Sequence, residues 1–266
     1  MLAAGLSYRE AGPADAPVVL MLHGYPQSSF MWSGVMPSLA DAGWRALAPD
    51  FAGYGDSAPD PPATWERHVE SLERFRGELG IESCVLVVHD WGGLIGMRWA
   101  CEHPSALEAL VISSTGFFPN GRWHGMAKAL REPGTGEQLM AGIDRDGFAA
   151  VMRQSSSGIS DKAIAEYWKG YADETRRRGQ LEMYRSGNFS KLEAYDLAGL
   201  GVPTLLLWGE HDEFAPVAGP HRFQRELPDT ELVVVEGARH FVWEDAPAES
   251  AAALTGFLVR VRGSAA

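Results

Sequence analysis

The amino-acid sequence predicts an α/β fold with a mainly parallel central sheet, flanked by helices and interrupted by an inserted helical cap. Apolar runs of strand length alternate with amphipathic helical patterns, as βαβ units require. This rhythm stops after residue 116 and resumes near residue 201. Polar residues follow the apolar runs directly, where sites form in open parallel sheets. We therefore expect a core at 1–116, a helical cap at 117–200 and the rest of the core at 201–266.

Composition limits the function classes. A chain of 266 residues is long enough for one large α/β domain. The net charge of −12, with acidic and basic residues interspersed, argues against nucleic acid or an anionic membrane as a partner. Neither a targeting leader nor a run of membrane-spanning length is evident, so we expect a cytoplasmic protein, a monomer or a homodimer, that acts on a small molecule.

The two cysteines, Cys84 and Cys101, suggest reduced, buried thiols rather than a disulfide framework or a metal cluster. We therefore expect neither a metal nor a cofactor.

The predicted elements follow the chain in order. The segment from 17 to 22 is a continuous apolar run, typical of a buried strand. The segment from 65 to 80 carries apolar residues at three- and four-residue steps, typical of an amphipathic helix. Further strands are predicted at 44–49, 107–113, 202–208 and 232–235, and further helices at 33–42 and 246–261.

Residues 85–100 are the central feature, because they predict a strand, a sharp turn and a helix. Two glycines after the turn let the helix begin close to the strand, so that Asp90 projects from a nucleophile elbow. A carboxylate at this position attacks a saturated carbon and forms an alkyl ester that water must cleave. The alternative is that Asp90 merely caps the helix. The adjacent His89 is expected to face away from the site.

The two partners of such a nucleophile follow the next predicted strands. Asp212 comes after the strand that ends near residue 208, and His240 comes after the strand that ends at residue 235. The order of nucleophile, acid and histidine fits a hydrolase triad, with His240 as the base and Asp212 as its orienting partner. Glu210 and Glu213 are near enough in sequence to replace Asp212.

Cleavage of the ester develops an oxyanion on the Asp90 carboxyl group, which backbone N–H groups must stabilise. The candidates are the amides of Trp91, at the start of the elbow helix, and of Tyr25, which follows His23-Gly24. Pro26 cannot donate, and an aromatic-Pro bond is prone to be cis. These residues predict an oxyanion hole formed by Tyr25 and Trp91.

Five motifs together resemble the α/β-hydrolase superfamily. They are HGYPQS at 23–28, DFAGYGDS at 50–57, VHDWGG at 88–93, WGEHD at 208–212 and RHFVWEDAP at 239–247. The resemblance covers both core portions and points to the branch with an aspartate nucleophile, the epoxide hydrolases and haloalkane dehalogenases. It implies the α/β-hydrolase fold and an alkyl-enzyme intermediate under a helical cap.

Epoxide hydrolases protonate the leaving alkoxide with tyrosines of the cap. The segment around Tyr184 looks like the second of these tyrosine segments, which makes Tyr184 the expected proton donor. The first cap tyrosine is not evident, although Tyr167 or Tyr171 could serve. The cap aromatics also suggest an apolar pocket. We therefore expect an epoxide hydrolase that opens an apolar or aromatic epoxide to a diol.

Haloalkane dehalogenases, the alternative, hold the departing halide with N–H donors. Trp91 follows the nucleophile as in those enzymes, and Trp123 or Trp168 could be the second donor. Tyr25 stands where an asparagine would favour this alternative. Fluoroacetate-type dehalogenases fit less well, because they carry arginine at the position of Trp91. A third class, a receptor that keeps the fold with an idle triad, would bind ligands without turnover.

Overall fold

A computed structural model describes residues 1–264 and contains an eight-stranded sheet. The strands lie in the order β1-β2-β4-β3-β5-β6-β7-β8. β1 and β2 pair antiparallel with their neighbours, and the remaining strands pair in parallel. The strands are β1 (Leu2–Ala3), β2 (Leu6–Ala11), β3 (Val18–Leu22), β4 (Arg45–Pro49), β5 (Cys84–His89), β6 (Leu107–Ser113), β7 (Thr204–Gly209) and β8 (Thr230–Val235). The predicted α/β class with a mainly parallel sheet is confirmed, whereas β1 and β2 were not predicted.

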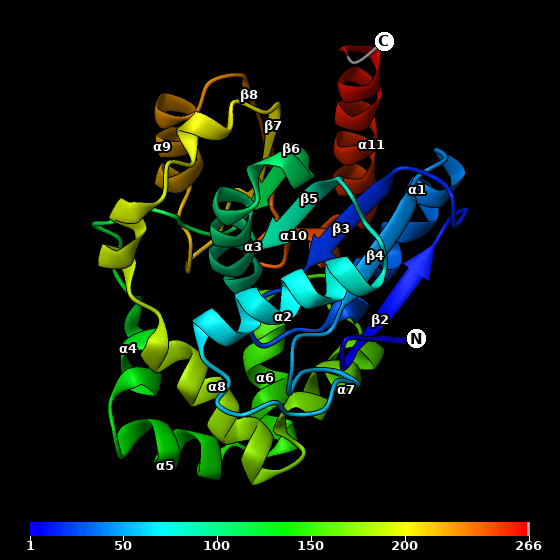
Figure 1. The fold of residues 1–266 in the computed structure, drawn as a ribbon. Helices are drawn as coiled ribbons and strands as arrows, with labels where there is room; N and C mark the ends of the chain where they lie inside the picture. The colour runs from blue at the N-terminus through cyan, green and yellow to red at the C-terminus, as the bar shows by residue number, and fades with distance from the viewer. Residues whose placement is uncertain (265–266) are drawn as a thin grey trace.

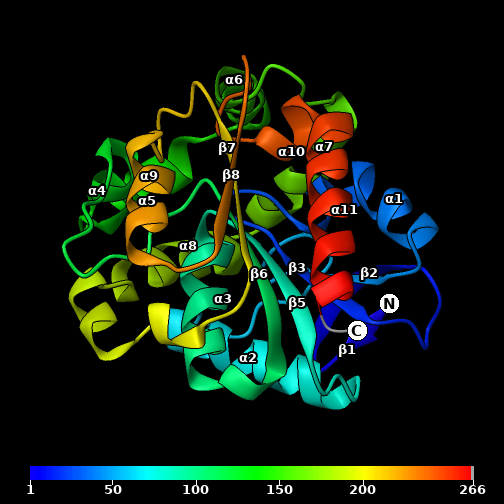
Figure 2. The same ribbon diagram turned by 90° about the horizontal axis from the view of Figure 1, so that it is seen from above.

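Helices cover both faces of the sheet, which explains the unbroken apolar runs of its central strands. Every residue of β5 and β7 is buried. Helices α1 and α11 lie on one face, and α2, α3 and α9 lie on the other (Figure 2). These helices are α1 (Met36–Asp41), α2 (Trp65–Glu78), α3 (Trp91–Glu102), α9 (Ala218–Glu226) and α11 (Pro247–Ser264), and the short α10 is Val242–Asp245. The unpredicted helices here are α9 and α10.

The segment between β6 and β7, all of which belongs to the described part of the chain, contains helices and no strands. We call residues 117–200 the cap segment. Its helices gather beyond the carboxyl ends of the parallel strands (Figure 1). They are α4 (Gly125–Arg131), α5 (Thr135–Gly142), α6 (Arg145–Ser155), α7 (Asp161–Trp168) and α8 (Glu174–Ser186). Short 3₁₀ helices occur at Ser29–Gly34, Pro104–Ala106, Lys169–Tyr171, Phe189–Ala194 and Ala198–Leu200. The domain boundaries at 116 and 200 stay a prediction.

Two further observations concern the composition. Cys84 is buried in β5, Cys101 is half-buried in α3, and both are free thiols. Across residues 1–264, every helix is too short or too polar to cross a membrane.

Candidate active site

Asp90 stands at a strained turn between β5 and α3. Its backbone has φ 48° and ψ −119°, a conformation that side-chain-bearing residues rarely adopt. The turn depends on close backbone contacts. A Cβ on Gly92 would lie 2.4 Å from the carbonyl oxygen of Leu22, and one on Gly24 would lie 2.4 Å from Cβ of Asp90. Glycine at these positions therefore lets the loop after β3 meet the turn that holds the nucleophile candidate.

The Asp90 carboxylate accepts a hydrogen bond from a neighbouring loop instead of capping its own helix. Oδ1 accepts from the backbone N–H of Tyr25 at 2.7 Å. Within the described structure, the Asp90 side chain makes no capping bond to α3. The Trp91 amide also stabilises the ionised carboxylate. The two amides expected to form an oxyanion hole thus meet at one carboxyl group, and the Tyr25-Pro26 bond is cis.

His240 lies between two carboxylates. Its Nδ1 is 3.0 Å from both oxygens of Asp212. Its Nε2 is 3.7 Å from Oδ2 of Asp90, which is an ionic contact too long for a hydrogen bond. Asp212 Oδ1 also accepts from the amides of Phe214 and Ala215, at 2.9 and 2.8 Å. The structure therefore brings the three predicted triad residues together.

The alternatives to Asp212 lie elsewhere. Glu210 accepts from the Gly237 amide at the surface, and Glu213 is exposed.

The charges of the site are strongly coupled. Burial lowers the pKa of His240, but Asp212 and then Asp90 raise it more, to about 10. Burial raises the pKa of Asp90, and the interaction with His240 outweighs it, so that this pKa lies below its usual range. The pKa of Asp212 is lowered in the same way. The site therefore holds an imidazolium between two ionised carboxylates at neutral pH.

Two cavities meet at this triad. The larger has a volume of about 600 Å³ and extends beneath the cap segment, with mostly apolar walls. The smaller has a volume of about 260 Å³. Both cavities are lined by Asp90, His124, Tyr184, Phe214 and His240. Asp90 can therefore reach a reacting atom whose substituents extend in two directions.

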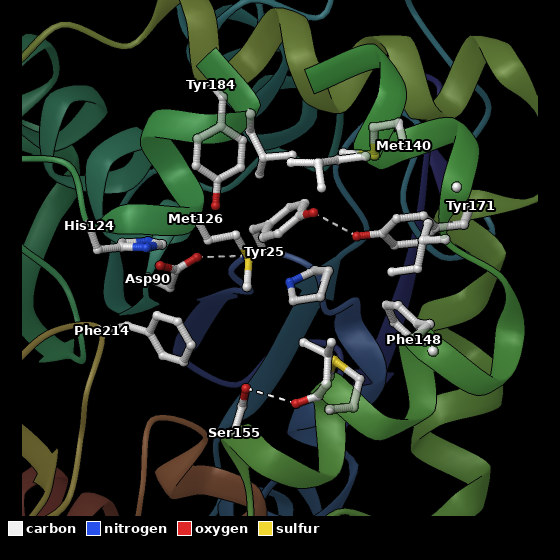
Figure 3. Close-up of a pocket in the computed structure, with 18 of the residues that line it drawn as sticks. Tyr25, Asp90, His124, Met126, Met140, Phe148, Ser155, Tyr171, Tyr184 and Phe214 are labelled. Carbon is white, nitrogen blue, oxygen red and sulfur yellow. Dashed lines mark hydrogen bonds between the residues drawn. The ribbon is translucent and has the colours of Figure 1, made fainter. Parts of the chain in front are cut away.

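The predicted cap aromatics divide into two groups. Tyr184 and Tyr171 line the larger cavity, where the hydroxyl of Tyr184 points towards Asp90 (Figure 3). The hydroxyls of Tyr171 and Tyr25 are 2.6 Å apart, so one of them donates to the other. Trp123 lines the smaller cavity and stacks on Trp91, with ring centroids 5.5 Å apart.

Tyr167 and Trp168 are not among the residues that line either cavity, so a role for them in substrate binding stays a prediction. Tyr167 is buried and donates to Oε1 of Glu244 at 2.7 Å. Trp168 stacks on Tyr171, with an interplanar angle of 4°. Both belong to α7, and the side-chain direction of this helix is set by its packing on the core. Helical spacing alone did not show that direction.

Sequence reasoning missed two residues that line both cavities, His124 and Phe214. The ring of Phe214 packs against His124 on one side and His240 on the other, with centroids 5.2 and 5.1 Å away. The sequence offered one indication of His124: it follows Trp123, a candidate site residue, and directly precedes a segment with a helical pattern. His89 is buried behind His240, with ring centroids 5.0 Å apart, and burial and the charge of His240 lower its pKa to about 3. His89 thus packs against the base from the side of the core.

Comparison with known proteins gives the family. Residues 17–247 match the family model described as alpha/beta hydrolase fold. A cis-3-alkyl-4-alkyloxetan-2-one decarboxylase of Xanthomonas campestris is 30% identical, over 96% of this chain and 92% of the relative. Epoxide hydrolase 2 of Siraitia grosvenorii is 27% identical, over 96% and 95% of the two chains. The crystal structure of haloalkane dehalogenase DbeA from Bradyrhizobium elkani aligns with a TM-score of 0.86 and 26% identity, covering 99% and 98% of the two chains. The chain belongs to the α/β-hydrolase fold family, as an enzyme of the haloalkane dehalogenase and epoxide hydrolase type.

Proposed function

We propose that the protein is an epoxide hydrolase that converts an apolar or aromatic epoxide to a diol through an ester on Asp90. The observation that carries this proposal is the buried hydroxyl of Tyr184, which faces Asp90 across the cavity (Figure 3). An epoxide leaves as an alkoxide that stays attached to the carbon skeleton, and it needs a proton donor opposite the nucleophile. We infer that Tyr184 is that donor.

The pKa of Tyr184 supports a neutral phenol in the resting site. Burial and then the charge of Asp90 raise this pKa well above its ordinary value, while the Trp91 indole, beside the hydroxyl, opposes the rise. The ring of Tyr184 is also held edge-on against Tyr25 and Trp91, with centroids 5.0 and 5.1 Å away. The phenol is therefore protonated before the reaction and fixed in direction.

The first step of the proposed reaction is alkylation. Oδ1 of Asp90 is held by the Tyr25 amide, which leaves Oδ2 as the attacking oxygen. Oδ2 forms a bond to an epoxide carbon, the bond from that carbon to the ring oxygen breaks, and Tyr184 gives its proton to this oxygen. Alkylation removes the charge of Asp90 and lowers the pKa of His240, so the His240 imidazolium gives up its proton, which returns through water to the phenolate of Tyr184.

The second step is hydrolysis of the ester. Because alkylation removes the charge of Asp90, the pKa of His240 falls and the imidazole can accept a proton from water. This water attacks the carboxyl carbon of Asp90, and the Tyr25 and Trp91 amides stabilise the resulting oxyanion. Collapse of this intermediate breaks the ester bond, releases the diol and restores the Asp90 carboxylate, in which one oxygen comes from water.

The substrate we propose is an apolar ring with substituents on both sides. The walls of the larger cavity include Met152, Phe148 and Leu130, which bind hydrocarbon and offer no charge. Because the smaller cavity opens from the same Asp90, a second substituent has a place of its own.

Haloalkane dehalogenation by the same triad is the second candidate. It is favoured by Trp91, which lines the smaller cavity beside Asp90 and could hold a halide through its indole N–H. Tyr184 competes for that donor, because its hydroxyl lies next to the same indole. A halide would have to displace this contact.

The decarboxylase relative suggests a second kind of strained ring, an oxetan-2-one, as a substrate to test. Its name gives a four-membered lactone with two adjacent alkyl groups as its substrate. Two cavities that meet at one carboxylate would accept such a ring. The diagnostic product is an alkene with carbon dioxide instead of a diol.

The test uses a His240→Gln variant, in which alkylation can run but ester hydrolysis should stall. The variant is incubated separately with an aryl epoxide, a bromoalkane and a dialkyl oxetan-2-one, and its intact mass and modified peptide are then determined. An adduct on Asp90 that carries the whole epoxide mass supports the proposal. An alkyl adduct without bromine supports the second candidate. Turnover of the lactone alone, to an alkene, would overturn both, and His240→Gln/Asp90→Asn is the control that should stay unmodified.

A further inference from the structure

His124 occupies the junction of the two cavities, and nothing in the triad chemistry accounts for it. It lines both cavities together with Asp90 and Tyr184. Its imidazole extends from the start of α4 towards the Asp90 carboxylate (Figure 3). The electrostatic influence of Asp90 and His240 on His124 also shows that the three groups are close. His124 is therefore placed to contact a molecule bound at Asp90.

The hydrogen bonding of His124 fixes which ring nitrogen carries the proton. Nδ1 accepts from the backbone N–H of Ala127 at 3.4 Å, as the cap of α4. Burial lowers the pKa of His124 more than Asp90 raises it, so the ring is neutral at pH 7. A neutral imidazole that accepts at one nitrogen carries its proton on the other. Nε2 is therefore an N–H donor at the cavity side of the ring.

The packing around His124 holds this donor in place. Phe214 meets the ring edge-on, at 5.2 Å and 70° between the planes. The same Phe214 ring meets His240 at 5.1 Å. One aromatic ring thus fixes the distance between His124 and the base, as a positioned donor requires.

The tyrosines of the site leave room for a second donor. The oxygen that leaves becomes an alkoxide with more than one lone pair, and each donor that reaches it stabilises the developing charge. The hydroxyls of Tyr171 and Tyr25 pair with each other, so one of their two protons is already used.

We propose that Nε2–H of His124 is the second hydrogen-bond donor to the leaving oxygen, beside the hydroxyl of Tyr184. This inference rests on the proposed function. Tyr184 transfers its proton to the oxygen, while His124 keeps its own proton and stabilises the developing negative charge through a hydrogen bond. The reacting class remains a strained cyclic ether or ester whose ring oxygen leaves.

The test separates alkylation from hydrolysis with two matched substitutions. In the His240→Gln background, His124→Asn keeps an oxygen where Nδ1 caps α4 but ends short of Nε2, and His124→Gln places an amide N–H near Nε2. Adduct formation with an aryl epoxide is followed by rapid quenching and intact mass. We expect the Asn variant to form the adduct about 100-fold more slowly, as for loss of a single oxyanion donor. We expect the Gln variant to recover most of that loss.

Two further readouts exclude a merely structural role. Asparagine is a favoured helix cap, so the Tm of His124→Asn should match that of its parent. With His240 intact, hydrolysis of the preformed ester should run at the same rate in wild type and His124→Asn, because the leaving oxygen has no part in that step. If the His240→Gln parent forms no adduct, the proposed function and this inference both fail. If the parent forms the adduct and His124→Asn forms it equally fast, the role of His124 alone is overturned.

Discussion

His240 changes its protonation during the proposed reaction, and Asp90 and Asp212 control this change. Both carboxylates raise the pKa of the imidazole, to about 10, against the effect of burial. The resting ring is therefore charged and cannot accept a proton from water. Esterification neutralises Asp90 and removes one of the two carboxylates that raise this pKa. His240 can therefore act as a base only after the ester on Asp90 has formed. Proton transfer from water to His240 is thus restricted to the hydrolysis step.

Asp212→Asn tests this control at a single residue. The amide cannot stabilise the imidazolium that forms when water is activated, and it can hold the ring in the wrong tautomer. We expect alkylation of Asp90 to survive and ester hydrolysis to slow by about 10³-fold or more. Stopped-flow or quenched mixing with an epoxide should show a burst of adduct followed by slow product release.

The matched control is Glu213→Gln, an exposed neighbour in the same loop. It should release product at the wild-type rate. Equal losses in the two variants would show that the loop, and not the Asp212 contact with His240, sets the hydrolysis rate.

At the scale of elements, the short helix α10 connects three parts of the active site. It begins two residues after His240. Glu244 accepts from Gln27, in the loop that supplies the oxyanion amide, at 2.6 Å, and from Tyr167 of the cap segment at 2.7 Å. Asp245 accepts from the amides of Ser157 and Gly158, also in the cap segment. One turn of helix therefore joins the base loop, the oxyanion loop and the cap segment.

Glu244→Gln tests the effect of this junction on stability. Burial, with a smaller contribution from Asp245, raises the pKa of Glu244 to about 7 despite its two hydrogen bonds. The folded state therefore holds a proton that the unfolded chain releases near pH 4.5. The stability from this group is present below pH 4.5 and is lost as the pH rises through 7.

Glutamine keeps the shape of the side chain and cannot ionise. We expect Glu244→Gln to equal wild type near pH 4.5 and to exceed it by about 2 kcal/mol at pH 8, a value below the full pKa difference because Glu244 is partly exposed. Urea unfolding from pH 4.5 to 8 measures the difference. The exposed Glu249→Gln is the control and should show no such trend. A wild type that gains stability relative to Glu244→Gln at high pH would contradict the assignment.

The elements also show what the sequence could predict. Strand ends in a parallel sheet fix where their next residues lie, so Asp90, Asp212 and His240 could be placed together without coordinates. No comparable rule predicts from the sequence where the side chains of the cap segment point. The directions of Tyr167 and Trp168 depend on how α7 packs against the core, and His124 enters the site because it caps α4. β1 and β2 carry mixed burial and lie at the sheet edge, so their pattern differs little from that of a loop.

At the scale of the whole molecule, exposed apolar residues mark the entrance to the site. Met126, Leu139 and Val151 are large hydrophobic side chains that remain exposed, and all three line the larger cavity. They belong to α4, α5 and α6, so the mouth lies among the first helices of the cap segment. Exposed apolar patches of this kind commonly mark ligand-binding grooves. An apolar substrate would enter here and reach Asp90 along apolar walls.

Val151→Trp narrows this mouth without touching the triad. We expect kcat/KM for an epoxide with a long alkyl chain to fall about tenfold, because one or two displaced methylenes in an apolar pocket cost about 1–3 kcal/mol. A short epoxide that stays near Asp90 should keep its kcat/KM within about twofold, a difference within 0.5 kcal/mol. Steady-state rates for a series of chain lengths measure both effects.

The matched control is Val259→Trp, which places the same bulk on an exposed position of α11, away from the cavity. It should leave the whole chain-length series unchanged. An equal fall for short and long epoxides in Val151→Trp would mean that the substitution disturbs the cap segment as a unit. A long-chain substrate that is unaffected would instead place the entrance at the smaller cavity, between Trp123 and Phe189, where both side chains line the wall.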